Sequence, residues 1–395
     1  MTCPKGQVII FFIILPMYEY QKSSRFFAQT ADDIKELAAQ ELAELGAGDI
    51  IPAYRGIYFN ADKAALYRIN YSAKLISRVL GSILTFKCHS TDQLYKKAKQ
   101  IKWSDFITTG KTFAVFSNVS DSKINNSHYA SLCIKDAIVD SFREQTGKRP
   151  DVDSKDPDLW INLFVSRNKA VISLDTSGGT LHKRGYRKDS LTAPMQETVA
   201  AAIIRYTEWD GSVPLYDPMC GSATLLCEAM LHYCKVPSGF LRKHFGFEFM
   251  PDFDKKLWRE IKKDCDRKKI RLPKGLISGS DISSLAVKTS WLNINNIPDG
   301  KNINVDKLDF NKAKGLENGV IVTNPPYGIR MGNKDELNVL YKSLGDFLKQ
   351  KCKGSSAYIY FGEREFIKKI GLKPTWKKPL MSGGLDGRLV KYELF

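Results

Sequence analysis

The chain has few of the residue patterns that hold metals, disulfide frameworks or membrane spans. Its 395 residues contain eight cysteines, none spaced as C-x-x-C, and five histidines that do not cluster with them. This scatter disfavours a metal site and a secreted disulfide framework. The apolar run "QVIIFFIILPMY" near the start is too short to cross a bilayer and is interrupted by Pro16. We expect a cytoplasmic protein without a membrane segment, in which Met17 is an alternative first residue.

Two nucleotide-binding patterns are also missing. The chain contains neither a G-x-G-x-x-G run after a strand nor a G-x-x-x-x-G-K-[ST] loop, which disfavours dinucleotide and triphosphate sites. It has instead a large excess of positive charge, because 60 Lys and Arg residues face 43 Asp and Glu residues, for a formal net charge of +17. Such an excess favours a polyanionic partner, most often nucleic acid.

The length predicts more than one domain. Residues 30–48 have the apolar period of a helix, with Thr30 as the expected cap, and a strand and two helical stretches follow. We predict an N-terminal extension (1–25), a small α+β domain (26–70), a second α+β domain (71–178) that includes a hairpin or an adjacent strand pair around "SRNK", a basic linker (179–188) and a last domain (189–395). The linker "HKRGYRK" is either a solvated connection or a nucleic-acid contact, and its candidate phosphate ligands are Lys183, Arg184 and Arg187.

The last domain alternates strands and helices, which predicts an open parallel sheet with helices on both faces. Ligands of such sheets bind at the carboxyl ends of the strands. Four expected strands end in polar or turn residues, in the stretches "LYDPMCGSAT", "ISGSD", "INVDKLD" and "VIVTNPPYG". Gly221 would let a ligand approach the first turn, Asp281 could accept hydrogen bonds from ribose hydroxyls, and Asp309 could accept from an adenine amine.

The stretch "TNPPYG" at residues 323–328 is the most specific of these ends. Methylation of an exocyclic base amine requires that the nitrogen lone pair is withdrawn from the ring. The Asn324 side-chain oxygen and the Pro325 carbonyl can accept the two amine hydrogens, and the prolines stiffen that carbonyl. Tyr327 offers a ring on which an extruded base can stack.

These motifs resemble class I S-adenosylmethionine-dependent amino-methyltransferases, and more closely the bacterial group that methylates the 2-amino group of guanine in large-subunit ribosomal RNA. The resemblance covers nearly the whole chain from Phe26 and includes "LYRINYSAKLISRVL", "LHKRGYR" and "APMQETVAAAII". It implies a ferredoxin-like domain, a THUMP RNA-binding domain and a Rossmann-like methyltransferase domain, with S-adenosylmethionine as cofactor and ribosomal RNA as partner.

The resemblance also assigns roles to residues. The implied cofactor-binding residues are Asp217, Pro218, Cys220, Gly221, Ser222, Thr224, Asp281 and Asp309, and the implied catalytic residues are Asn324, Pro325, Pro326 and Tyr327. The family usually has glycine where Ala223 stands, which bears on cofactor affinity. Three alternatives remain open: a tRNA guanine methyltransferase, a DNA adenine methyltransferase, which would share NPPY but not the THUMP-like front, and a non-catalytic RNA-binding protein.

Overall fold

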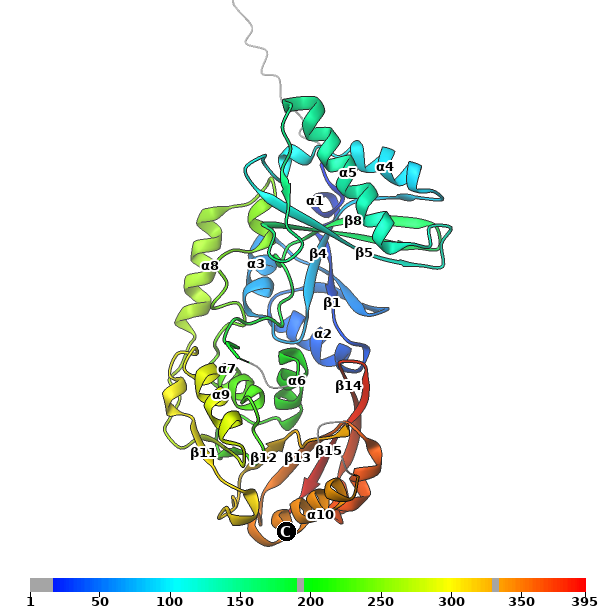
Figure 1. The fold of residues 1–395 in the computed structure, drawn as a ribbon. Coiled ribbons are helices and arrows are strands. Elements are labelled where there is room, and N and C mark those ends of the chain that lie inside the picture. Colours follow the sequence, from blue (N-terminus) through cyan, green and yellow to red (C-terminus); the bar gives the residue numbers. More distant parts are fainter. Residues whose placement is uncertain (1–16, 190–194, 329–333) are drawn as a thin grey trace, which may run out of the picture.

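The computed structural model describes residues 17–189, 195–328 and 334–395 and arranges them in two sheets, one above the other (Figure 1). The expectation about the apolar start concerns residues outside these ranges. Among the helices described, none is long and apolar enough to cross a membrane.

The upper sheet has eight strands and joins the two N-terminal units. Its strands, in spatial order, are β2 (Gly48–Ala53), β3 (Gly56–Asn60), β1 (Arg25–Gln29), β4 (Arg78–Lys87), β8 (Lys169–Asp175), β7 (Leu159–Ser166), β5 (Thr112–Ser120) and β6 (Asp151–Val152). Strand β4 pairs antiparallel with β1 on one side and with β8 on the other. The expected hairpin around "SRNK" is confirmed as β7 and β8, whose turn residues Arg167 and Asn168 both have positive φ.

Five helices accompany this sheet: α1 (Glu19–Ser23), α2 (Lys35–Glu44), α3 (Lys63–Ser72), α4 (Thr91–Lys99) and α5 (Ser127–Thr146). The predicted cap at Thr30 is wrong. The helix is entered through a 3₁₀ turn, η1 (Asp32–Ile34), and the Thr30 hydroxyl donates to the Leu75 carbonyl oxygen at 3.0 Å instead. A tertiary acceptor has replaced the local capping contact that the sequence favours.

The lower sheet has seven strands. Their spatial order is β11 (Asn304–Lys307), β10 (Ile277–Asp281), β9 (Leu215–Asp217), β12 (Val320–Thr323), β13 (Ser356–Phe361), β15 (Leu385–Glu393) and β14 (Trp376–Ser382). The first five strands are parallel, as expected. Strand β15 is antiparallel to both of its neighbours, so the prediction of a parallel sheet fails for the last two strands, which form a hairpin.

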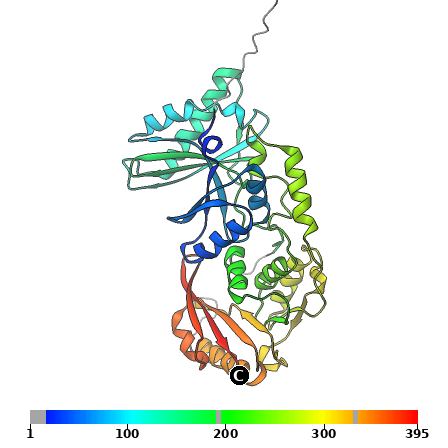
Figure 2. The ribbon, with the colours of Figure 1, turned by 180° about the vertical axis from the view of Figure 1, so that it is seen from behind.

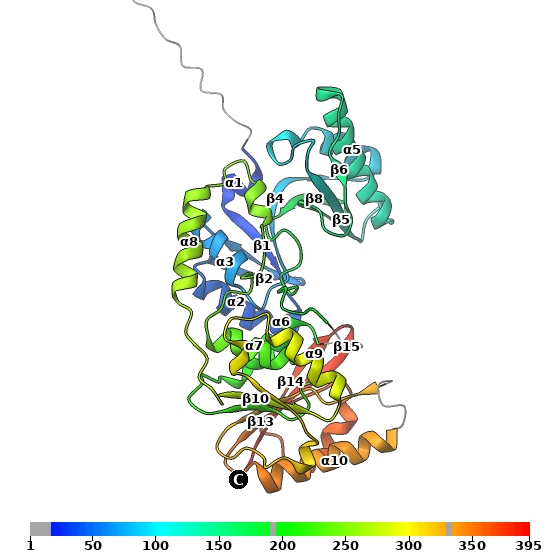
Figure 3. The ribbon, with the colours of Figure 1, turned by 60° about the vertical axis from the view of Figure 1, so that its left-hand side comes forward.

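Helices cover both faces of the lower sheet, and these are α6 (Glu197–Thr207), α7 (Thr224–Tyr233), α9 (Ser284–Ile294) and α10 (Lys334–Lys351). Alternate residues of β13 show the two faces. Ala357 and Ile359 belong to the same core as Leu344 of α10, whereas Tyr358 belongs to the core that contains Leu226 of α7. Figure 3 shows α10 on one side of the sheet and α7 and α9 on the other.

A segment between α7 and β10 leaves the lower unit and packs on the upper one. Its helix α8 (Lys255–Arg267) lies along α3 (Figures 1 and 3). The Tyr67 ring stacks on Phe247 with centroids 4.5 Å apart, and the Tyr71 hydroxyl donates to Asp266 Oδ1 at 2.8 Å. Seen from behind, the β14–β15 hairpin also reaches the upper unit near η1 (Figure 2). The two sheets are therefore connected by more than the basic linker.

Candidate cofactor and catalytic site

The strand order brings the four predicted strand ends to one edge of the lower sheet. Strands β11, β10, β9 and β12 are consecutive neighbours and all parallel. The chain moves from β9 toward β11 on one side and returns to β12 on the other. The order therefore reverses between β9 and β12, and ligands of open α/β sheets bind at such a switch point. Each strand carries one of the predicted groups at its carboxyl end: Asp309 for β11, Asp281 for β10, the loop after Asp217 for β9, and Asn324 for β12.

The loop after β9 is tied to the end of β10. The Gly221 amide donates to Asp281 Oδ2 at 3.0 Å, and the Cys220 amide donates to the Ser280 carbonyl oxygen at 2.9 Å. The other carboxylate oxygen of Asp281 accepts from the Ser283 amide at 2.9 Å. Asp281 is half-buried and holds the loop in place. Its expected contact with the ribose of a cofactor stays a prediction.

Two residues of this loop have left-handed backbone conformations. Gly221 has φ of 54°, which glycine adopts without a Cβ penalty. Ala223 has φ of 61° and ψ of 27°, is fully buried, and directly precedes α7. A left-handed alanine is strained, which gives a physical reason to expect glycine at this position.

Asp217 lies beneath the loop and is 1% exposed. Its Oδ1 accepts from the Met219 amide at 3.0 Å. Burial raises the pKa of this carboxyl to about 7, against the lowering effect of the Met219 amide. Asp217 therefore stabilises the turn through its hydrogen bond with the Met219 amide. Asp309 is half-buried after β11, and its Oδ1 accepts from the Asn311 amide at 2.9 Å.

Two residues of α9 that were not among the predicted site residues support the loop. The Ser290 hydroxyl donates to the Gly221 carbonyl oxygen at 2.7 Å, and Asn293 Nδ2 donates to the Ser222 carbonyl oxygen at 3.1 Å. Both side chains are buried. The sequence signal that could have identified Ser290 and Asn293 is the presence of polar residues on the apolar face of a helix, because polar groups buried there need hydrogen-bond partners.

Gly279 in β10 was also missed, and it makes room for the loop. A Cβ at this position would lie 2.6 Å from Leu226 Cδ1, 3.1 Å from Cys220 Cβ and 3.2 Å from the Asp217 carbonyl oxygen. A side chain at this position would therefore displace the loop or the start of α7.

The "TNPPYG" stretch begins where β12 ends at Thr323. The Asn324 Oδ1 atom is buried and has no hydrogen-bond partner in the described part of the chain. Buried acceptors without partners are rare in folded proteins, so this oxygen is available to accept a hydrogen bond from a group other than the described residues. The Pro326 carbonyl oxygen accepts from the Tyr341 hydroxyl of α10 at 3.3 Å, which fixes the proline pair from outside.

Tyr327 is 9% exposed and packs edge-on against Tyr360, with ring centroids 6.2 Å apart. Its ring lies over the backbone of Gly362, where a Cβ would come within 2.5 Å of the ring. The position of the tyrosine is therefore fixed by the end of β13. Its role in stacking a base stays a prediction.

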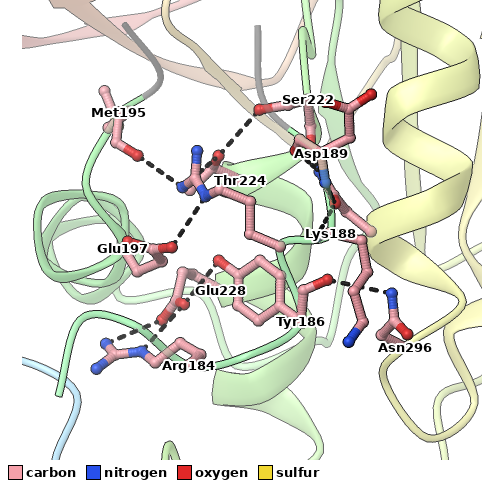
Figure 4. Close-up of polar contacts among 12 residues, drawn as sticks. Arg184, Tyr186, Lys188, Asp189, Met195, Glu197, Ser222, Thr224, Glu228 and Asn296 are labelled. Atoms are coloured by element: carbon pink, nitrogen blue, oxygen red, sulfur yellow. Dashed lines mark hydrogen bonds and ion pairs between the residues drawn. The ribbon is translucent and has the colours of Figure 1, made fainter. Parts of the chain in front are cut away.

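The structure contradicts part of the prediction for the basic linker. Arg184 is 1% exposed and pairs with Glu228 of α7, so its assignment as a phosphate ligand is wrong (Figure 4). Arg187 also points inward, with 16% of its side chain exposed, and pairs with Glu197 at 3.0 Å. A low-dielectric interior requires each buried cation to have a partner, and acids of α6 and α7 supply them. Lys183 is exposed, and its contact with RNA stays a prediction.

Arg184 also links the two units. Its Nη2 donates to the Lys74 carbonyl oxygen at 2.6 Å, and its Nη1 donates to the Leu181 carbonyl oxygen at 2.8 Å. The Tyr186 hydroxyl donates to Glu228 Oε1 at 3.0 Å (Figure 4). The linker therefore connects the upper unit with the helix that follows the cofactor loop through the buried side chains of Arg184 and Tyr186.

Three protein-family models match successive parts of this chain. Residues 184–391 match the model of the RMKL-like methyltransferase domain, residues 88–175 that of the THUMP domain, and residues 25–80 that of the RlmL ferredoxin-like domain. The chain belongs to the RMKL-like methyltransferase family. The fold class and family that the sequence indicated are confirmed, while the predicted domain boundaries stay predictions.

Curated relatives of this methyltransferase include "Putative RNA methyltransferase slr0064" from Synechocystis, which is 36% identical over 374 residues and aligned over 94% of this chain and 97% of that protein. Ribosomal RNA large subunit methyltransferase K/L from Photobacterium profundum is 35% identical over 375 residues, covering 93% of this chain and 53% of that protein. The chain thus spans about half the length of the K/L relatives.

Solved structures give the same result. SMU.472 complexed with SAH has a TM-score of 0.82 and 25% identity, covering 94% of this chain and 98% of that chain. A predicted N6-adenine-specific DNA methylase from Listeria monocytogenes has a TM-score of 0.81 and 26% identity, covering 94% of this chain and 96% of that chain. The methyltransferase uses S-adenosylmethionine as methyl donor.

The residues at the switch point fit this cofactor. The loop has the positive-φ glycine that close approach requires, and a carboxylate, Asp281, stands at the end of the neighbouring strand. Two buried polar atoms without partners among the described residues, Asn324 Oδ1 and Arg187 Nη1, belong to segments that contact this edge. The described residues hold no cluster of His, Cys, Asp and Glu that could bind a metal ion.

Proposed function

We propose that this methyltransferase methylates the exocyclic 2-amino group of a guanine in RNA, with large-subunit ribosomal RNA as the substrate. The names of the K/L relatives support this substrate, as does the net charge of +17. The THUMP match lies in the same chain as the methyltransferase domain, an arrangement that a DNA adenine methyltransferase does not need.

The observation that carries the proposal is the buried, unpartnered Oδ1 of Asn324. A base amine presents two hydrogens, and Asn324 Oδ1 and the Pro325 carbonyl oxygen accept one each. This withdraws the nitrogen lone pair from the ring and directs it toward the cofactor loop beside β12. The bound cofactor supplies an electrophilic methyl group. The amine becomes acidic only once it is methylated, so its proton passes to water without a strong general base.

The substitution Asn324→Ala tests this role. The lost acceptor matters most while the nitrogen pyramidalises, so single-turnover methyl transfer to ribosomal RNA should fall about 10²-fold or more, with little change in cofactor or RNA affinity. Asn302→Ala is the matched control, because its side chain donates to the Leu272 carbonyl oxygen at 2.7 Å, away from the site. The control should lose ~1 kcal/mol of stability and keep its rate.

A near-normal rate in folded Asn324→Ala protein would contradict the amine-holding role. Identification of the methylated nucleoside separates the substrates. N2-methylguanosine in large-subunit RNA from cells that carry the gene, absent from a deletion strain, supports the proposal. N6-methyladenine, or N2-methylguanosine confined to tRNA, would replace it.

A further inference from the structure

Arg187 has donors that nothing in the described chain uses. Its Nε donates to Glu197 Oε1 at 3.0 Å, and its Nη2 donates to the Met195 carbonyl oxygen at 2.9 Å and to Thr224 Oγ1 at 3.3 Å. The Nη1 atom is buried and makes no hydrogen bond with any described residue. A guanidinium carries five N–H donors in a fixed plane, so three of them are used and the two on Nη1 are not.

The unused donors lie next to the cofactor loop. Thr224 is the first residue of α7, and its hydroxyl lies 3.4 Å from that of Ser222. The contacts on Nε and Nη2 orient the guanidinium, and Figure 4 labels the residues that accept them, Glu197, Met195 and Thr224. A buried donor of a charged group that stays unpaired costs ~1–3 kcal/mol or more, so the position of Nη1 calls for an acceptor other than the described residues.

The chemistry of the donor selects the acceptor. An arginine fork binds carboxylates and phosphates most strongly, because the hydrogen bonds are charge-assisted and their geometry matches. The cofactor has a single anionic group, the α-carboxylate of its methionine part. Asp281 and Asp309 occupy the β10–β11 side of the site, whereas Arg187 contacts the start of α7 at the other end of the loop.

We propose that Arg187 binds the α-carboxylate of the cofactor through Nη1. Glu197 and Thr224 hold the guanidinium in the required orientation, and the linker thereby couples cofactor binding to the turn that carries Arg184. This binding step does not depend on which nucleic acid is methylated. A failure of the RNA assignment and a failure of this assignment are therefore distinguishable.

The test uses two ligands that differ only in the carboxylate: S-adenosylhomocysteine and its decarboxylated analogue, titrated calorimetrically into the full chain. In Arg187→Met the dissociation constant of S-adenosylhomocysteine should rise about 100-fold, or ~2.8 kcal/mol at 1.4 kcal/mol per decade, while that of the analogue changes less than about threefold. Arg187→Lys should recover part of the loss. Lys183→Met, an exposed cation of the same turn, should bind both ligands like the wild type.

Equal weakening of both ligands in Arg187→Met would assign the arginine a purely structural role and overturn the proposal. Unchanged binding of S-adenosylhomocysteine would overturn it as well. Should Arg187→Met not fold, Arg187→Lys is compared with the wild type instead. The wild type should prefer S-adenosylhomocysteine over the analogue by about 100-fold, and this preference should shrink in Arg187→Lys. Equal affinity of the wild type for the two ligands, or an undiminished preference in Arg187→Lys, would overturn the proposal.

Discussion

The buried pair of Arg184 and Glu228 permits a quantitative prediction for Glu228→Gln. Both side chains are 0% exposed, and the carboxylate accepts from Arg184 Nε at 3.3 Å, from Nη2 at 3.4 Å and from the Tyr186 hydroxyl at 3.0 Å. Glutamine preserves the shape of the side chain and one acceptor oxygen. It removes the negative charge and places an amide donor against the guanidinium.

The expected cost follows from the charge that remains. Arg184 keeps its two bonds to the carbonyl oxygens of Leu181 and Lys74, but these neutral acceptors do not compensate a buried positive charge. Breaking one side of a buried ion pair costs about 3–5 kcal/mol. At ~2–4 °C per kcal/mol for a domain of 150–250 residues, the melting temperature should fall by roughly 10 °C. Adding Arg184→Met removes the stranded charge, so the double variant should be more stable than Glu228→Gln alone.

Urea unfolding followed by circular dichroism, with scanning calorimetry on the same proteins, measures these differences. Glu260→Gln makes the same chemical change at an exposed position of α8 and should stay within ~0.5 kcal/mol of the wild type. A loss below ~1 kcal/mol in Glu228→Gln would refute the reasoning, because it would mean that solvent or another group compensates Arg184. The reasoning would also be refuted if the double variant were the least stable protein of the set.

Three further predictions concern the loop. The pKa of Asp217 is raised to about 7, so its contribution to stability is full below pH ~4, the unfolded pKa, and is lost as pH rises toward 7. The stability of Asp217→Asn relative to the wild type should therefore increase between pH 5 and pH 8. A difference in urea midpoints that does not change with pH would contradict this. Ala223→Val places a β-branched residue at φ of 61° and should lose ~2 kcal/mol or more, whereas Ala223→Gly should stay within ~1 kcal/mol, as thermal unfolding would show. In Gly279→Ala the new Cβ would meet Leu226 at 2.6 Å, so this variant should lose ~1–3 kcal/mol of stability and bind S-adenosylhomocysteine more weakly. Gly110→Ala is the control, because no heavy atom lies within 4 Å of its new Cβ. An equal loss of stability in the control would remove the steric explanation.

Features that depend on chain neighbours can be predicted from the amino-acid sequence. The strand β12 and the "TNPPYG" stretch are adjacent in sequence, and so are β9 and its glycine-bearing loop, so their motifs could be recognised without a structure. Parallel strands joined by helices bring their carboxyl ends to one edge, and this rule placed Asp217, Asp281 and Asn324 at one candidate site. The hairpin of β7 and β8 was predictable for the same reason, because its turn is local.

Which charges are buried depends on how distant segments pack and is not predictable from the sequence. "HKRGYRK" is basic in sequence, which predicts either a solvated linker or a nucleic-acid contact, but Glu228 lies 44 residues after Arg184 and reaches it only when α7 packs on the linker. Ser290 and Asn293 support a loop about 70 residues earlier in the chain, and α8 leaves its own unit to pack on α3. The hydrophobic period of a helix shows that it has a buried face but does not show what that face contacts. The partners of buried polar groups come from distant segments, and their identity depends on how the elements pack.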